Sequence, residues 1–137
     1  MLAALAMTLR AGAQAPATPA QERTTKAGVY TAAQAVRGEQ TYMDACVSCH
    51  PPGAHKGGPF LEWQGYTLDK FVAFLIETMP ENEPGSLTPK EYAQVVAYLL
   101  KTNGMPAGQE ELPSDPALLH TITINLLPGR PLPSHHP

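Results

Sequence analysis

Apolar residues recur with helical spacing in the middle of the chain. From residue 68 to residue 79 they fall at positions i, i+3, i+4, i+7, i+8 and i+11, and they are Leu68, Phe71, Val72, Leu75, Ile76 and Met79. Because this spacing places them on one side of a helix, the pattern predicts an amphipathic helix that begins after Thr67 and faces a core. Pro80 ends it, since proline cannot continue a helix.

Two further helices are predicted from their capping signals. Thr31 can cap a helix that runs toward Ala45, with Gln34 three residues after the cap closing a capping box. A later helix has Thr88 as its N-cap and Glu91 as the second half of its box. Strand signals are weak throughout this stretch. The sequence therefore predicts an all-α fold with three main helices.

The two ends of the chain differ in composition from the middle. Residues 1–15 hold an apolar run and then an Ala-x-Ala arrangement, typical of a secretory signal peptide, although no Lys or Arg precedes the run and the peptide could be truncated. Residues 16–28 predict a flexible linker. Residues 107–137 are rich in proline and predict an irregular extended tail, in which residues 121–127 can lie along the surface. We expect an exported, periplasmic protein whose folded domain spans residues 29–106.

Composition narrows the class of protein. A chain of 137 residues that is 43% hydrophobic and 15% charged suits one soluble domain. The net charge of −3 offers no basic face for nucleic acid, and two cysteines are too few for a disulfide scaffold. After the leader, no segment approaches the roughly 20 apolar residues that span a bilayer. The predicted helices cover only about 75 residues, and a core of that size is marginal without a metal or a large apolar cofactor.

The pentapeptide at residues 46–50, Cys-Val-Ser-Cys-His, predicts an attachment site for such a cofactor. C-x-x-C-H is the attachment signature for c-type haem. Two thiols at this spacing can reach the two vinyl groups of one haem, and the adjacent histidine then points at the iron. We therefore predict one covalent haem c, bound through Cys46 and Cys49, with His50 as its proximal iron ligand.

Three other uses of these residues compete with haem attachment. A thioredoxin-like redox pair opens a helix, whereas this pair is predicted to end one. A structural zinc site needs four ligands, and His55 alone does not complete the set. A disulfide between Cys46 and Cys49 suits an oxidising compartment, but it leaves His50 and the small core unexplained.

Residues 38–50 resemble the opening of a class I monohaem cytochrome c of the bacterial, periplasmic type. In that family a glycine and an aromatic residue precede the first cysteine by eight and four positions, as Gly38 and Tyr42 do here. The family's Gly-Pro-x-Leu stretch is matched at residues 58–61, and its apolar-Ala-Tyr-Leu helix at residues 96–99. The resemblance implies a small cytochrome c fold, with three main helices around one covalently attached haem, and it leaves the Pro-rich C-terminal tail out.

Packing considerations agree with that fold. Gly38 has no Cβ, so a second helix can cross close against it, and Tyr42 one turn later can fill the adjoining gap. Val95 and Tyr98 on the last predicted helix are the expected partners. We therefore predict that the first and last helices cross at Gly38.

The resemblance also implies Met79 as the distal iron ligand. Many bacterial relatives place this ligand in a Met-Pro pair before the last helix, and Met79-Pro80 matches that position. Met79 also continues the apolar stripe described above, so simple packing is an alternative role. Met105-Pro106 is a second such pair beyond the last helix, and His120 could reach the iron only if the tail folded over the distal side. An open distal site is the remaining possibility.

The resemblance implies a function in electron transfer rather than catalysis. Such a protein carries single electrons between periplasmic or membrane-bound redox partners, such as a dehydrogenase, an oxidase or another cytochrome. Two alternatives stay open. The chain could be the haem-bearing electron-transfer subunit of a periplasmic dehydrogenase complex, or a haem-based ligand sensor with an open distal site. Neither nucleic acid nor a membrane span in the mature chain is expected.

Overall fold

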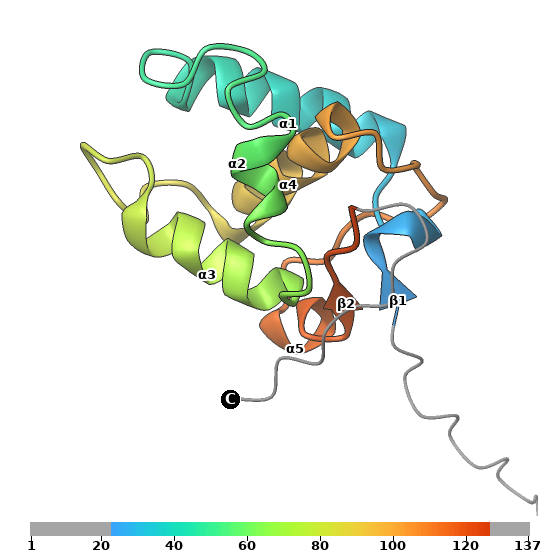
Figure 1. The fold of residues 1–137 in the computed structure, drawn as a ribbon. Coiled ribbons are helices and arrows are strands. Elements are labelled where there is room, and N and C mark those ends of the chain that lie inside the picture. Colours follow the sequence, from blue (N-terminus) through green and yellow to red (C-terminus); the bar gives the residue numbers. More distant parts are fainter. Residues whose placement is uncertain (1–22, 127–137) are drawn as a thin grey trace, which may run out of the picture.

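The computed structural model describes residues 23–126 and is built mainly of helices, as predicted for an all-α fold. Figure 1 shows α2 lying between α1 and α3, with α5 below the end of α3 and the β1–β2 pair to the right of α5. The elements in chain order are β1 (Arg23–Thr24), a 3-10 turn (Thr25–Ala27), α1 (Ala32–Ala45), α2 (Gly58–Leu61), α3 (Leu68–Thr78), α4 (Pro89–Thr102), α5 (Pro116–Leu119) and β2 (Ile122–Thr123).

The helix starts confirm the capping predictions with one correction. The capping box of α4 is complete, because Thr88 and Glu91 bond to each other's backbone N–H groups. At α1, the Thr31 hydroxyl accepts from the Gln34 N–H at 3.1 Å, as expected. The predicted capping box at α1 is wrong, however, because the Gln34 side chain does not bond back to the N-cap. The buried Gln34 amide bonds instead to the backbone carbonyl and N–H of Leu112, at 2.9 and 2.7 Å.

Helices α1 and α4 cross closely at Gly38, which confirms the predicted crossing. A Cβ on Gly38 would lie 1.8 Å from the carbonyl oxygen of Gln94 and 3.1 Å from the Cβ of Tyr98. One turn further along α1, the rings of Tyr42 and Tyr98 pack at a tilt of 52° with centroids 5.1 Å apart. The crossing therefore depends on the absence of a side chain at residue 38.

The segment after α4 packs into the fold, whereas the sequence predicted an extended tail. Residues 106–126, here called the C-terminal strap, carry Ile122 and Ile124, whose side chains are fully buried in the same core as α4. Strand β2 within the strap pairs in parallel with β1, in the register Arg23 with Ile122. Residues 23–28 of the predicted linker and residues 107–126 of the predicted tail thus fold together with the predicted domain.

The strap also fastens the loop between α2 and α3. The Gly65 N–H donates to the Ile124 carbonyl at 2.9 Å, and the Ile124 N–H donates to the Tyr66 carbonyl at 2.8 Å. The Leu126 N–H donates to the side-chain oxygen of Gln64 at 2.7 Å. Because these bonds satisfy backbone groups on both sides, the strap fixes the path of this loop.

A contact between His120 and Asp69 joins the strap to the first turn of α3. His120 Nδ1 lies 3.0 Å from a carboxylate oxygen of Asp69. Burial acts to raise the pKa of Asp69, but the Thr67 hydroxyl, the His120 ring and the Lys70 N–H favour its charged form. Together they hold the pKa of Asp69 below its usual value of 3.8.

We predict that Asp69→Asn lowers the melting temperature by a few degrees at neutral pH and that the difference closes in acid. A carboxyl whose pKa is lowered by folding stabilises the fold above its unfolded pKa, and this contribution is lost as the pH falls through the folded pKa. A partly exposed pair contributes about 1 kcal/mol or less. Melting curves of both proteins between neutral and acidic pH test this, with exposed Glu110→Gln as control. An offset that stays constant with pH would contradict it.

None of the helices in residues 23–126 has both the length and the apolar character needed to cross a bilayer. The predicted signal peptide at residues 1–15, the first part of the predicted linker and residues 127–137 lie outside the described residues.

Candidate haem site

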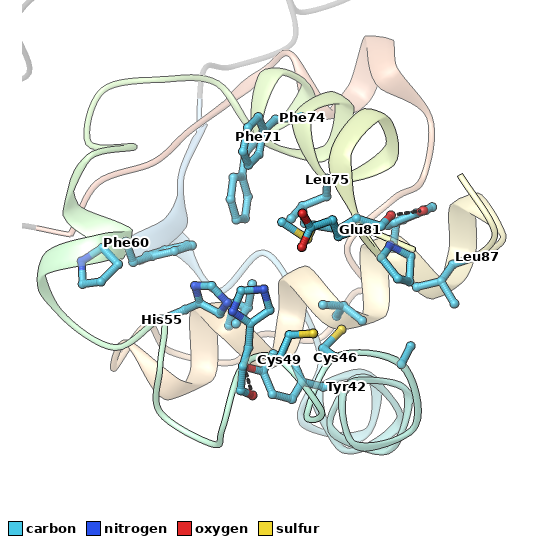
Figure 2. Close-up of a pocket in the computed structure, with 18 of the residues that line it drawn as sticks. Tyr42, Cys46, Cys49, His55, Phe60, Phe71, Phe74, Leu75, Glu81 and Leu87 are labelled. Carbon is cyan, nitrogen blue, oxygen red and sulfur yellow. Dashed lines mark hydrogen bonds between the residues drawn. The ribbon is translucent and has the colours of Figure 1, made fainter. Parts of the chain in front are cut away.

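A cavity of about 370 Å³ opens between α1, α3 and α4, and all four residues predicted to bind haem line it. Figure 2 shows Cys46 and Cys49 on one side of this cavity, with Phe71, Phe74 and Leu75 on the other. The volume lies within the range of small-molecule and cofactor sites in proteins. Most of the wall is apolar, and its apolar side chains include Phe60, Trp63, Phe71, Leu75, Leu87 and Leu99.

The end of α1 presents the Cys-x-x-Cys-His motif to the cavity. Cys46 is the C-cap of α1, and its carbonyl accepts from the N–H groups of Cys49 and His50, at 3.1 and 2.9 Å. The Tyr42 hydroxyl donates to the His50 carbonyl at 2.9 Å. Burial, followed by Cys46 and Tyr98, raises the pKa of Tyr42 to about 12, so its hydroxyl stays a neutral donor. The tight turn places both thiols and the imidazole along one cavity.

The surroundings of the two cysteines argue against a thioredoxin-like redox pair and against a structural zinc site. Both thiols are free, with Cys46 half-buried and Cys49 exposed. Burial raises the pKa of Cys46, whereas a redox-active thiol of the thioredoxin type has a lowered pKa. Within residues 23–126, no three side chains of His, Cys, Asp or Glu come close enough together to hold a metal ion such as zinc.

Met79 enters the cavity from the end of α3. It is the C-cap of that helix, and its N–H donates to the Leu75 carbonyl at 2.8 Å. The Tyr92 hydroxyl on α4 donates to the Met79 carbonyl at 2.7 Å. Figure 2 places Leu75 and Glu81, which flank Met79 in the chain, across the cavity from Cys46. Met79 itself lines the same cavity as Cys46, Cys49 and His50.

The other candidate distal ligands lie elsewhere. Met105 is buried outside the cavity wall, where its sulfur accepts a hydrogen bond from the Thr25 hydroxyl at 3.5 Å. Its carbonyl accepts from the Tyr30 hydroxyl at 2.6 Å. His120 does not line the cavity either, and it pairs with Asp69 at the far end of α3. Met105 thus contacts the turn at Thr25, and His120 joins the strap to α3.

Trp63 and His55 also line the cavity, although the sequence analysis did not assign them to the site. The Trp63 ring packs against Phe71 and Phe74, with centroids 4.8 and 5.2 Å apart. The His55 ring lies 4.6 Å from that of His50. Burial and then the neighbouring His50 lower the pKa of His55, so its neutral form is favoured. Trp63 carries no local signal for this role, whereas the nearness of His55 to the motif was visible in the sequence.

The donor set and the wall fit a covalently attached haem. Two thiols, an imidazole and a thioether are the groups that bind the macrocycle and its iron in c-type cytochromes. Aromatic and aliphatic side chains form the rest of the wall, as an apolar macrocycle requires. The charged side chain of Glu81 lies at the exposed edge of the wall, where a carboxylate keeps its contact with solvent.

Comparison with known families agrees with the site. Residues 33–99 match the family described as cytochrome C oxidase, cbb3-type, subunit III. This segment runs from α1 through most of α4 and contains the motif and Met79, but it leaves the C-terminal strap outside. The match supports a c-type cytochrome domain over residues 33–99, and the family so described implies covalently bound haem and electron transfer. No curated protein and no solved structure matches the chain.

Proposed function

We propose that this protein is a monohaem class I cytochrome c that carries single electrons in the periplasm. In this proposal Cys46 and Cys49 hold one haem, His50 is the proximal ligand and Met79 the distal ligand. The observation that carries it is the single cavity that all four residues line. When bound, haem supplies a reversible one-electron iron couple, and a thioether opposite an imidazole raises its potential.

The chain's own residues prepare the site for electron transfer by holding both ligand positions in place. Tyr42 bonds to the backbone carbonyl of His50, and Tyr92 bonds to that of Met79. Both tyrosines are themselves buried, at 2 and 3% exposure, so they tie the ligands to the helical core. A site fixed in this way has little to rearrange when its charge changes.

The proposed partners are redox proteins, because a haem held in this cavity would exchange electrons with another redox centre. Glu77, Glu81 and Glu83 are exposed around the loop that carries Met79, so the partner is expected to present basic groups near its own redox centre. The predicted leader and the attachment chemistry together favour the periplasm.

A second candidate is a haem-bearing subunit of a larger redox complex. It is favoured by the description of the matching family, which names an oxidase subunit. The strap, which lies outside that match, is the surface we expect to differ between such a subunit and a free carrier. Co-purification of the natively expressed protein with a dehydrogenase or an oxidase separates this candidate from the first.

Reductive titration of the purified, exported protein tests the proposed function. A single-electron carrier gives one transition with a slope of about 59 mV per tenfold change in the ratio of oxidised to reduced protein. Carbon monoxide added to the reduced protein is expected to bind slowly, because Met79 occupies the distal position. Rapid binding of carbon monoxide would instead support a ligand sensor with an open distal site, and absence of any one-electron transition would contradict a haem-based function altogether.

A further inference from the structure

Asn103, the C-cap of α4, reaches across to the loop that follows the attachment motif. Its Nδ2 donates to the His55 carbonyl at 3.0 Å and to the Leu99 carbonyl at 2.8 Å. Its Oδ1 accepts from the Gly57 N–H at 2.9 Å. One amide side chain thus connects two points of residues 51–57, here called the proximal loop, to the end of α4.

The proximal loop is tied to α2 at its last residue, where the Gly57 carbonyl accepts from the Phe60 and Leu61 N–H groups at 3.0 Å, but its other backbone bonds are local. The Ala54 N–H donates to the Pro51 carbonyl, and the Lys56 N–H donates to the Gly53 carbonyl, both at 2.9 Å. Each bond closes a turn inside the loop and reaches no other element. Most residues of the loop are exposed, so burial adds little to hold it.

The residue that Asn103 anchors carries a ring in the cavity. The His55 ring lies 4.6 Å from the His50 ring at an angle of 53°. On its other side it meets the Tyr42 ring edge-on, at 6.3 Å and 86°. Figure 2 shows His55 inside the ring of lining residues. His55 therefore packs beside the proposed proximal ligand and is itself held at its backbone by α4.

We propose that Asn103 is a positioning residue of the haem site and that it acts through His55. By fixing the His55 backbone, Asn103 keeps the His55 ring against His50 and limits rotation of the His50 imidazole. Groups that surround a ligating histidine set its ring orientation and its bond to the metal. This role rests on the proposed function, because it takes His50 as the iron ligand.

Four substitutions in the full-length, haem-loaded protein separate the contributions, and one of them, His55→Ala, removes the ring that Asn103 is proposed to act through. Asn103→Ala removes all three bonds. Asn103→Asp keeps an oxygen for the Gly57 N–H but loses both donated bonds. Thr102→Val is the matched control, because the Thr102 hydroxyl supports the same helix end by donating to the Tyr98 carbonyl at 2.6 Å rather than to the loop.

Amide hydrogen exchange at Gly57 measures the anchor itself. Loss of one hydrogen bond predicts an acceleration of about tenfold in Asn103→Ala. Exchange in Asn103→Asp and Thr102→Val is expected to stay near that of the wild type. Unchanged exchange in Asn103→Ala would show that the bond to Gly57 does not hold the loop, and it would overturn the proposal without bearing on haem binding.

Proton NMR of the ferric protein measures the effect on His50, because hyperfine-shifted signals depend on the plane of the axial imidazole. We expect altered signal positions in Asn103→Ala, in Asn103→Asp and in His55→Ala, and an unaltered spectrum in Thr102→Val. An unaltered spectrum in Asn103→Ala, an equal change in Thr102→Val, or no change in His55→Ala would each overturn the proposed route. Absence of hyperfine-shifted signals from the wild type as well would contradict the proposed function itself.

Discussion

Replacing Gly38 with alanine is expected to prevent native packing of α1 against α4. The added Cβ would lie 1.8 Å from the Gln94 carbonyl oxygen and 2.4 Å from its carbonyl carbon. These are backbone atoms within a helix, so they cannot move aside as the end of a side chain could. The two helices must separate, and overpacking of this kind costs about 1–3 kcal/mol or more. Against a total stability of roughly 5–15 kcal/mol, we expect a large fall in yield and in melting temperature.

The test is decisive because the close crossing predicts a loss of stability where helix propensity alone predicts a gain. In an unobstructed helix, alanine is more favourable than glycine by about 1 kcal/mol, so the substitution would otherwise stabilise α1. Val36→Ala is the matched control, because Val36 lies on the same helix and is 59% exposed. It should change stability by no more than about 0.5 kcal/mol. Denaturant unfolding of the two variants measures both, and a Gly38→Ala protein as stable as the wild type would disprove the close crossing.

Replacing Met79 with leucine is expected to abolish the band that arises from methionine bound to ferric haem iron. Leucine has a similar volume and keeps the wall filled, but it has no sulfur to donate. The reduced protein should then bind carbon monoxide rapidly. Its potential should fall by about 0.1 V or more, within the range of roughly 0.8 V that axial ligands span. Visible spectra and a redox titration measure these changes.

Met105→Leu provides the matched control for this prediction. Met105 is buried and follows α4, but its sulfur faces the Thr25 hydroxyl rather than the cavity. We expect it to keep the methionine band and the potential, with a small loss of stability. The opposite outcome, in which only Met105→Leu loses the band, would refute Met79 as the distal ligand.

Much of the helical framework could be predicted because its signals are local. The capping box of α4 needs only Thr88 and Glu91, three residues apart, and the start of α3 is marked by its apolar stripe. The crossing at Gly38 was also predictable, since a glycine within an amphipathic helix has few other uses. In each case the deciding interaction lies within a few residues or within one helix pair.

The C-terminal strap could not be predicted because its partners are distant in the sequence. Arg23 pairs with Ile122, and Gln34 bonds to Leu112, across most of the described chain. A strand of two residues has no detectable alternation, and the prolines around it favour an irregular structure. Burial of Ile122 and Ile124 is what overrides that local preference.

At the site, motif spacing in the sequence identified the candidate haem-binding residues. The residues that surround and hold them could be identified only from the structure. Cys46, Cys49, His50 and Met79 line one cavity, and their roles toward haem stay predictions. The tyrosine bonds to the two ligand carbonyls join residues 8 and 13 positions apart, and no motif encodes them. The anchor from Asn103 to the proximal loop spans 48 positions and was likewise outside the reach of local patterns.

The mass of the exported protein, expressed with the machinery for c-type cytochrome maturation, is the most direct test of haem attachment. The wild type should carry the added mass of one haem through denaturation, because two thioether bonds hold it. The double variant Cys46→Ala, Cys49→Ala should show the bare polypeptide mass. A wild-type protein that is folded and compact at the bare polypeptide mass would contradict a haem-based function for this chain.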